Sequence, residues 1–127
     1  FPECRFHLVD SRQKKIKVVQ EIVQHVGLNN VQISVQRVEQ LAAQYDFVVS
    51  RAVASMDKFI PWVRKRIHCR NKNALSNGIL YLRGEGVEEE MRKVKGGVRE
   101  WDTTPVSNYF EQPFFETKHL LYVNFCD

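Results

Sequence analysis

The 127-residue chain lacks several features that would each indicate a particular class of protein. No apolar run approaches the roughly 20 residues that a membrane-spanning helix needs. The start, FPECRFHLVD, has neither the basic region nor the long apolar region of a secretory signal peptide. There is no internal repeat and no low-complexity segment. We therefore expect no membrane partner and a fold of ordinary globular kind.

Cysteine is scarce. Cys4, Cys69 and Cys126 lie far apart and are odd in number, and no two have CxxC spacing. The four histidines show no metal-ligand spacing either. The sequence therefore predicts neither a disulfide framework nor a metal site, and this use of cysteine fits a reducing cytoplasm.

The excess of one charge sign is small. Nineteen Lys and Arg residues stand against fifteen Asp and Glu residues, which gives a net charge of +4. This excess permits a nucleic-acid partner without requiring one. With 43% apolar and 27% charged residues, the composition is typical of a folded protein. We expect one domain over residues 1–127.

Hydrophobic periodicity predicts strands that alternate with helices. Strands are expected at residues 5–10, 31–35, 45–50, 79–82, 98–106 and 119–125, and helices at residues 11–26, 38–43, 56–67 and 87–95. Ser11 and Gly27 are the expected caps of the first helix. This order predicts an α/β fold with a mostly parallel sheet, helices on both faces, and an antiparallel pair of strands at one edge.

Ligands of open α/β sheets bind beyond the carboxyl ends of the strands, which selects three residues. Asp10 closes the first strand and could accept hydrogen bonds from both hydroxyls of a ribose, or only cap the next helix. Glu39 follows the second strand and could accept a hydrogen bond from an adenine or ribose group, or lie exposed on a helix. Arg51 follows the third strand and could hold a carboxylate or phosphate, or be a solvated loop residue.

The densest basic stretch lies at residues 64–72 and contains Arg64, Arg66 and Arg70. Such a cluster could contact the phosphates of a nucleic acid, although a solvated helix end is the commoner explanation. Tyr109 and Phe110 could stack on bases.

Several segments together resemble the bacterial GidB family, also called ribosomal small-subunit methyltransferase G. FHLVDS at residues 6–11 and VGLNNV at residues 26–31 resemble parts of its second strand, helix and third strand. RVE at residues 37–39 resembles the family's Arg-Ala-Glu. YDFVVSRAVA at residues 45–54 resembles its Phe-Asp-x-Val-x-x-Arg-Ala-Val-Ala and is the most specific match. LRG at residues 82–84 resembles a Lys-Gly pair in which Arg83 replaces the lysine.

The resemblance implies a Rossmann-like methyltransferase fold and transfer of a methyl group from S-adenosyl-L-methionine to N7 of a guanine in 16S ribosomal RNA. Methylation of N7 removes no proton, so we expect positioning and stacking rather than a catalytic acid or base. The residues implied for the cofactor are Asp10, Ser11, Val38, Glu39 and Arg51. The residues expected on the RNA are Arg51, Arg83, Arg64, Arg66 and Arg70.

The family carries a Gly-rich cofactor loop just upstream of the segment that resembles Phe1, and this chain does not contain it. We therefore expect an incomplete, N-terminally truncated methyltransferase domain. Two alternatives stay open. One is an enzyme of the same fold that methylates a small molecule. The other is a non-catalytic α/β module that binds RNA or associates with itself through sheet edges that a missing first strand leaves unpaired.

Overall fold

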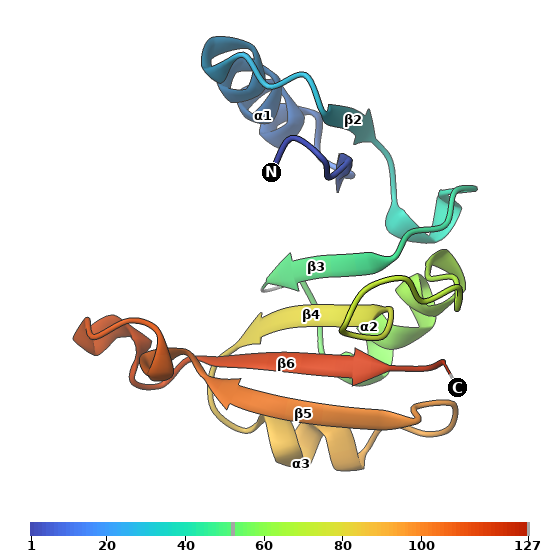
Figure 1. The fold of residues 1–127 in the computed structure, drawn as a ribbon, viewed down its shortest axis with the longest axis vertical. Coiled ribbons are helices and arrows are strands. Elements are labelled where there is room, and N and C mark those ends of the chain that lie inside the picture. The colour runs from blue at the N-terminus through green and yellow to red at the C-terminus, as the bar shows by residue number, and fades with distance from the viewer. Residues whose placement is uncertain (52, 127) are drawn as a thin grey trace. The chain divides into compact units, whose positions relative to one another are not determined.

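A computed structural model describes residues 1–51 and 53–126 (Figure 1). The chain divides into two compact units, Phe1–Ala42 and Ala43–Asp127, and each is considered separately. In the part of the chain that the structure describes, no helix combines the length and apolarity needed to cross a bilayer.

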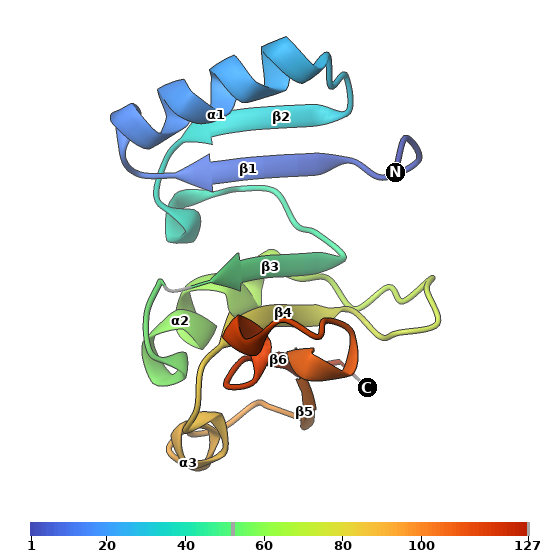
Figure 2. The same ribbon diagram turned by 90° about the vertical axis from the view of Figure 1, so that its left-hand side faces the viewer.

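Unit 1 is a strand–helix–strand motif in which α1 packs along two parallel strands (Figure 2). β1 (Phe6–Asp10) and β2 (Val31–Val35) pair in parallel, with Phe6 opposite Val31 and Asp10 opposite Val35. α1 (Gln13–Val26) buries Ile16, which is 1% exposed, and η1 (Val38–Gln40) is a 3₁₀ turn after β2. The parallel pairing brings the carboxyl ends of both strands to one edge.

The caps of α1 differ in part from the prediction. Gly27 ends the helix in the left-handed conformation with φ 75°, as predicted. Ser11 is not the N-cap, because the helix begins later and Arg12 occupies that position. The carboxylate of Asp10 accepts a hydrogen bond from the Arg12 N–H at 2.8 Å and so closes the turn that leads into the helix. The helix expected at residues 38–43 is only the three-residue η1.

Unit 2 contains a four-stranded mixed sheet with the order β3-β4-β6-β5. β3 (Phe47–Arg51) and β4 (Gly78–Arg83) are parallel, and β6 (His119–Asn124) runs antiparallel to both β4 and β5 (Glu100–Pro105). The connections contain α2 (Met56–Val63), η2 (Arg64–Arg66), α3 (Val87–Arg92), η3 (Val106–Asn108) and η4 (Pro113–Phe115). The predicted antiparallel pair is confirmed, and its later strand lies between β4 and β5.

The core of unit 2 lies on one face of this sheet. Ile79, Tyr81, Leu121 and Val123 are each fully buried, and α2 turns Met56, Phe59, Ile60 and Val63 toward the same core. Val49 and Leu82 belong to the other face and are 72% and 41% exposed. The expectation of helices on both faces is therefore wrong for the described part of unit 2, where α2 and α3 contact each other beside a single face.

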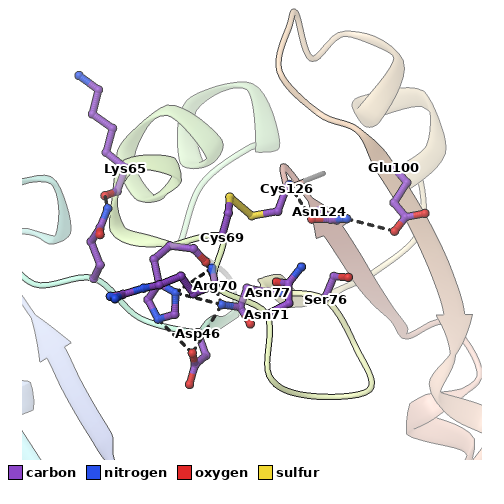
Figure 3. The surroundings of a disulfide bond; sticks show 12 residues. Asp46, Lys65, Cys69, Arg70, Asn71, Ser76, Asn77, Glu100, Asn124 and Cys126 are labelled. Carbon is purple, nitrogen blue, oxygen red and sulfur yellow. Dashed lines mark hydrogen bonds and ion pairs between the residues drawn. A yellow bond between two sulfur atoms is a disulfide. The ribbon is translucent and has the colours of Figure 1, made fainter.

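A disulfide joins Cys69 to Cys126 across 57 positions of sequence, although the odd number and wide spacing of the cysteines predicted no disulfide framework (Figure 3). Gly78 at the start of β4 lies opposite Asn124 at the end of β6. The segment before β4 and the segment after β6 therefore meet at one edge of the sheet, and the two Cα atoms are 5.3 Å apart. Cys4 is free and exposed, and the described residues contain no group that could hold a metal ion.

Candidate cofactor and substrate edges

Asp10 is the first candidate residue and lies where β1 ends. It is half-buried, and its backbone carbonyl accepts a hydrogen bond from the Gln36 N–H at 3.0 Å, which ties the ends of β1 and β2 together. Its Oδ1 caps the turn before α1, whereas no described residue donates to Oδ2. Capping and ligand binding are therefore compatible, because each uses a different oxygen of the carboxylate. Ser11 lies next to it and is exposed.

Glu39 lies in η1, immediately after the neighbouring strand. The Arg37 Nε donates a hydrogen bond to Glu39 Oε1 at 2.7 Å, and this bond is the largest cause of a lowered pKa of the Glu39 carboxyl. Glu39 is therefore ionised near neutral pH, and it remains exposed. Val38 beside it is half-buried and offers apolar surface.

The carboxyl edge of unit 1 thus carries two carboxylates. Asp10 lies at the end of β1, and Glu39 lies in η1, after the neighbouring strand β2. Such groups accept hydrogen bonds from hydroxyl and amino donors and repel phosphate. A nucleoside, with its ribose hydroxyls and exocyclic amine, has the chemistry that fits this edge.

Arg51 ends β3 in unit 2. It is exposed, pairs in register with Leu82, and forms no ion pair with any residue in the described ranges. Its guanidinium is therefore available for an anionic or π-rich ligand. Ala52 of the Arg-Ala-Val-Ala motif lies outside the described residues.

Tyr81 holds the turn that follows Arg51, and sequence reasoning missed it. The Val53 and Ala54 N–H groups donate to the Tyr81 hydroxyl at 2.8 and 3.3 Å, and that hydroxyl donates to the Ala54 carbonyl at 3.1 Å. Within the apolar run ILYL, a tyrosine is expected to be core, which it is. The signal that could have identified its role is the hydroxyl, because a buried tyrosine needs a polar partner.

Arg83 ends β4 and forms an ion pair with Glu90 of α3. Glu90 also accepts a hydrogen bond from the Met56 N–H at 2.6 Å, so one carboxylate caps α2 and holds Arg83. The side chains of Arg83 and Glu90 are 28% and 13% exposed. Arg83 therefore shapes the carboxyl edge, and its contact with RNA stays a prediction. Glu90 was missed because an acidic helix of sequence VEEEMR is typical of a solvated surface.

The other predicted RNA contacts lie elsewhere. Arg64 and Arg66 belong to η2, and Arg70 follows it in an exposed segment. Ile67 forms an isolated parallel β-bridge with Tyr45, just before β3. This basic stretch therefore lies at the amino ends of β3 and β4. The structure thus brings Arg51 and Arg83 to one edge of unit 2 and Arg64, Arg66 and Arg70 to the opposite edge.

Comparison with known proteins gives one family. The sequence profile of GidB, described as rRNA small subunit methyltransferase G, matches residues 1–108. A protein of Christiangramia forsetii named ribosomal RNA small subunit methyltransferase G is 47% identical over 122 residues, which are 96% of this chain and 56% of that protein. A protein of the same name from Cytophaga hutchinsonii is 42% identical over 97% of this chain and 58% of that protein. The chain thus spans somewhat more than half the length of these relatives.

Solved structures with low sequence identity share the fold. An rRNA methylase from Streptococcus thermophilus has a TM-score of 0.64 at 8% identity, over 97% of this chain and 74% of that one. The N-methyltransferase NodS from Bradyrhizobium japonicum has a TM-score of 0.58 at 12% identity, over 94% of this chain and 73% of that one. The α/β architecture described above is therefore of the Rossmann-like methyltransferase kind.

Proposed function

Because the chain belongs to the GidB family, rRNA small subunit methyltransferase G, we propose that it serves S-adenosyl-L-methionine-dependent methylation of guanine N7 in 16S ribosomal RNA. The observation that carries this proposal is the pair of carboxylates at the carboxyl edge of unit 1. Asp10 Oδ2 and the ionised Glu39 suit the hydroxyl and amino donors of an adenosyl group.

In this mechanism the side chains bind and orient the cofactor and the base. Asp10, with Ser11 beside it, accepts hydrogen bonds from the ribose, while Val38 and Glu39 lie against the adenine. Arg51 binds the methionine carboxylate or the incoming guanine. When bound, S-adenosyl-L-methionine supplies an electrophilic methyl group. Because N7 already carries a free lone pair, these side chains orient the reactants, and no residue has to remove a proton.

The partners follow from this activity. We propose ribosomal RNA as the substrate and the cytoplasm, where ribosomes assemble, as the location. Arg83 contributes to the edge by its ion pair with Glu90, which fixes the start of α2. Self-association through unpaired strand edges stays a prediction that the size of the particle in solution would decide.

Cofactor binding is tested first, by melting the chain with and without S-adenosylhomocysteine. A ligand that binds only the folded state stabilises it by about 2.7 kcal/mol at 100 times its dissociation constant. We expect the melting temperature of the native sequence to rise, and Asp10→Ala to abolish the rise. Glu21→Ala, an exposed change on α1, is the matched control and should respond like the native sequence.

Methyl transfer is tested next, with labelled S-adenosyl-L-methionine and unmodified 16S ribosomal RNA. We expect label at guanine N7 and its loss in Arg51→Ala. An equal melting response in the native sequence and Asp10→Ala would contradict the cofactor assignment. Transfer to a small molecule that is insensitive to salt would contradict the RNA assignment.

A further inference from the structure

Unit 2 has a concave surface, an open groove between α2 and the segment after α3. It encloses about 640 Å³, and its charged lining residues are Arg64, Lys65, Lys93, Lys95 and Asp57. Four cations against one carboxylate leave an excess of three positive charges in this groove. Arg64 and Lys65 belong to the basic stretch at residues 64–72, and the fold adds Lys93 and Lys95 from about thirty positions later in the chain.

The four cations of the groove form no ion pair among the described residues. Within the described ranges, the ion pairs of the molecule involve other residues, and none joins Arg64, Lys65, Lys93 or Lys95 to a carboxylate. Arg64 helps to build the wall, because its guanidinium lies 5.8 Å from the centre of the Phe125 ring and fills the space that a side chain at Gly97 would need. Like charges held together at a surface attract an anion.

The cations at the end of α2 and before β5 lie toward the amino ends of β3 and β4, whereas Arg51 lies at the carboxyl end of β3. The segment after α3 leads to Glu100, which pairs with Asn124, and Asn124 pairs with Gly78 at the start of β4. Figure 1 shows β3 and β4 pointing away from the end where β5 begins. A strand of six residues is about 20 Å long, so these cations lie away from the edge proposed for methyl transfer.

We propose that this groove binds the phosphodiester backbone of RNA at a second contact, away from the reacting base. The inference rests on the proposed function, since it takes the substrate to be RNA. The lining contains no aromatic side chain, and its apolar residues are Ile60, which is 3% exposed, the half-buried Val94 and the exposed Pro61. Protein interfaces are held chiefly by aromatic and arginine anchors, whereas phosphates need only cationic donors, which this lining supplies in excess. Lysine binds a phosphate as a point charge, and arginine binds it by two hydrogen bonds.

The test compares RNA binding by two charge-matched double variants. Lys93→Gln/Lys95→Gln removes two cations of the groove, and Lys14→Gln/Lys17→Gln removes two exposed cations of α1. The 127-residue chain is titrated with a labelled single-stranded RNA at salt concentrations from about 50 to 200 mM. Each lost phosphate contact lowers the slope of log affinity against log salt by about 0.7. We expect the groove variant to lose about 1.4 of this slope and the α1 variant to keep it.

Equal slopes for the two double variants would overturn the proposal, because binding would then follow net charge and not the groove. Displacement of the RNA by polyglutamate as readily as by polyphosphate would overturn the phosphate assignment. The proposed function fails on a different measurement: absence of a melting response to S-adenosylhomocysteine contradicts the cofactor site and leaves the RNA titration unaffected. Melting curves of both variants verify that they fold.

Discussion

At the scale of single residues, the Tyr81 hydroxyl has the largest consequence for the candidate site. It joins β4 to the turn that carries the end of the Arg51 motif, through contacts with Val53 and Ala54. The ring itself is fully buried and meets Phe59 edge-on, with the ring centres 4.9 Å apart. Removal of the oxygen alone therefore tests the polar contact without disturbing the apolar packing.

We expect Tyr81→Phe to lower the free energy of unfolding by about 0.5–1.5 kcal/mol, because the change removes the hydrogen bonds of the part-buried backbone groups of Val53 and Ala54. Urea unfolding measures this loss. Tyr109→Phe removes the same atom from a side chain that is 70% exposed and should leave the urea midpoint unchanged. Equal effects in the two variants would show that the hydroxyl of Tyr81 does not hold the turn.

Tyr122 makes stability depend on alkaline pH. Burial, and then the negative charge of Glu100, raise the pKa of this phenol above its ordinary value of 10.0. Its hydroxyl also donates to the Ser76 carbonyl at 2.8 Å, which only the neutral form can do. The unfolded chain releases this proton first, so the contribution is complete below pH 10 and is lost as pH rises through the folded pKa.

We therefore expect Tyr122→Phe to show a shallower loss of stability than the native sequence between about pH 9 and pH 11. The Tyr122→Phe variant should still lose some stability as the pH rises, because burial also raises the pKa of Tyr45. Urea midpoints across this pH range give the two curves. Parallel curves would mean that Tyr122 titrates alike in the folded and unfolded chains.

The sequence predicts residues at strand ends better than residues that support them. Asp10 and Arg51 follow from the periodicity of short strands and from the rule that ligands bind at carboxyl ends. Tyr81 and Glu90 act on turns that are distant in sequence, by 27 to 34 positions. A single sequence contains no signal for such a partner before the fold is known.

At the scale of elements, Gly27 decides where α1 ends. Its φ of 75° is accessible to glycine at no steric cost, and its N–H bonds back to the carbonyls of Val23 and Gln24. We expect Gly27→Ala to destabilise the chain by about 1–2 kcal/mol, because an alanine in this conformation crowds its own carbonyl. Thermal unfolding followed by circular dichroism measures this change.

Gly84→Ala is the control for this substitution. Gly84 has no positive φ, and a Cβ there would meet nothing within 4 Å. It should leave the melting temperature unchanged or raise it slightly, because alanine restricts the unfolded chain. A fall as large as that of Gly27→Ala would mean that loss of glycine, and not the left-handed conformation, causes the effect.

Element order is predictable here because most strands are short, rich in apolar or β-branched residues and bounded by turn residues; β5, with sequence EWDTTP, is the exception. Helix lengths are harder to predict than element order. The helix expected at residues 56–67 ends as an α-helix at Val63 and continues as the 3₁₀ turn η2. Pro61 lies inside α2 and cannot donate a backbone hydrogen bond, so the regular ladder is already broken before the predicted end.

At the scale of the whole molecule, the Cys69–Cys126 disulfide closes the largest covalent loop. The two residues are 57 positions apart, and a cross-link of that span stabilises a folded chain by about 4 kcal/mol through the entropy of the unfolded state. We expect a reductant to lower the urea midpoint of the native sequence. Cys69→Ser/Cys126→Ser should have the midpoint of the reduced native sequence, both with and without the reductant.

Cys4→Ser is the control for the cysteine substitutions, because Cys4 is exposed and unpaired. It should unfold like the native sequence and keep its response to the reductant. A native sequence that does not respond to the reductant would show that the disulfide contributes nothing to stability. This pairing could not be predicted from spacing, since it depends on which strands become neighbours.

The position of β6 between β4 and β5 also affects how the protein folds during its synthesis. β5 emerges from the ribosome before β6, yet β6 is its hydrogen-bonding neighbour, and β5 has no contact with β4 in the ladder. The four-stranded sheet therefore stays open until translation reaches Asn124. Until then β5 is an unpaired strand on a nascent chain, the kind of segment that chaperones protect from aggregation.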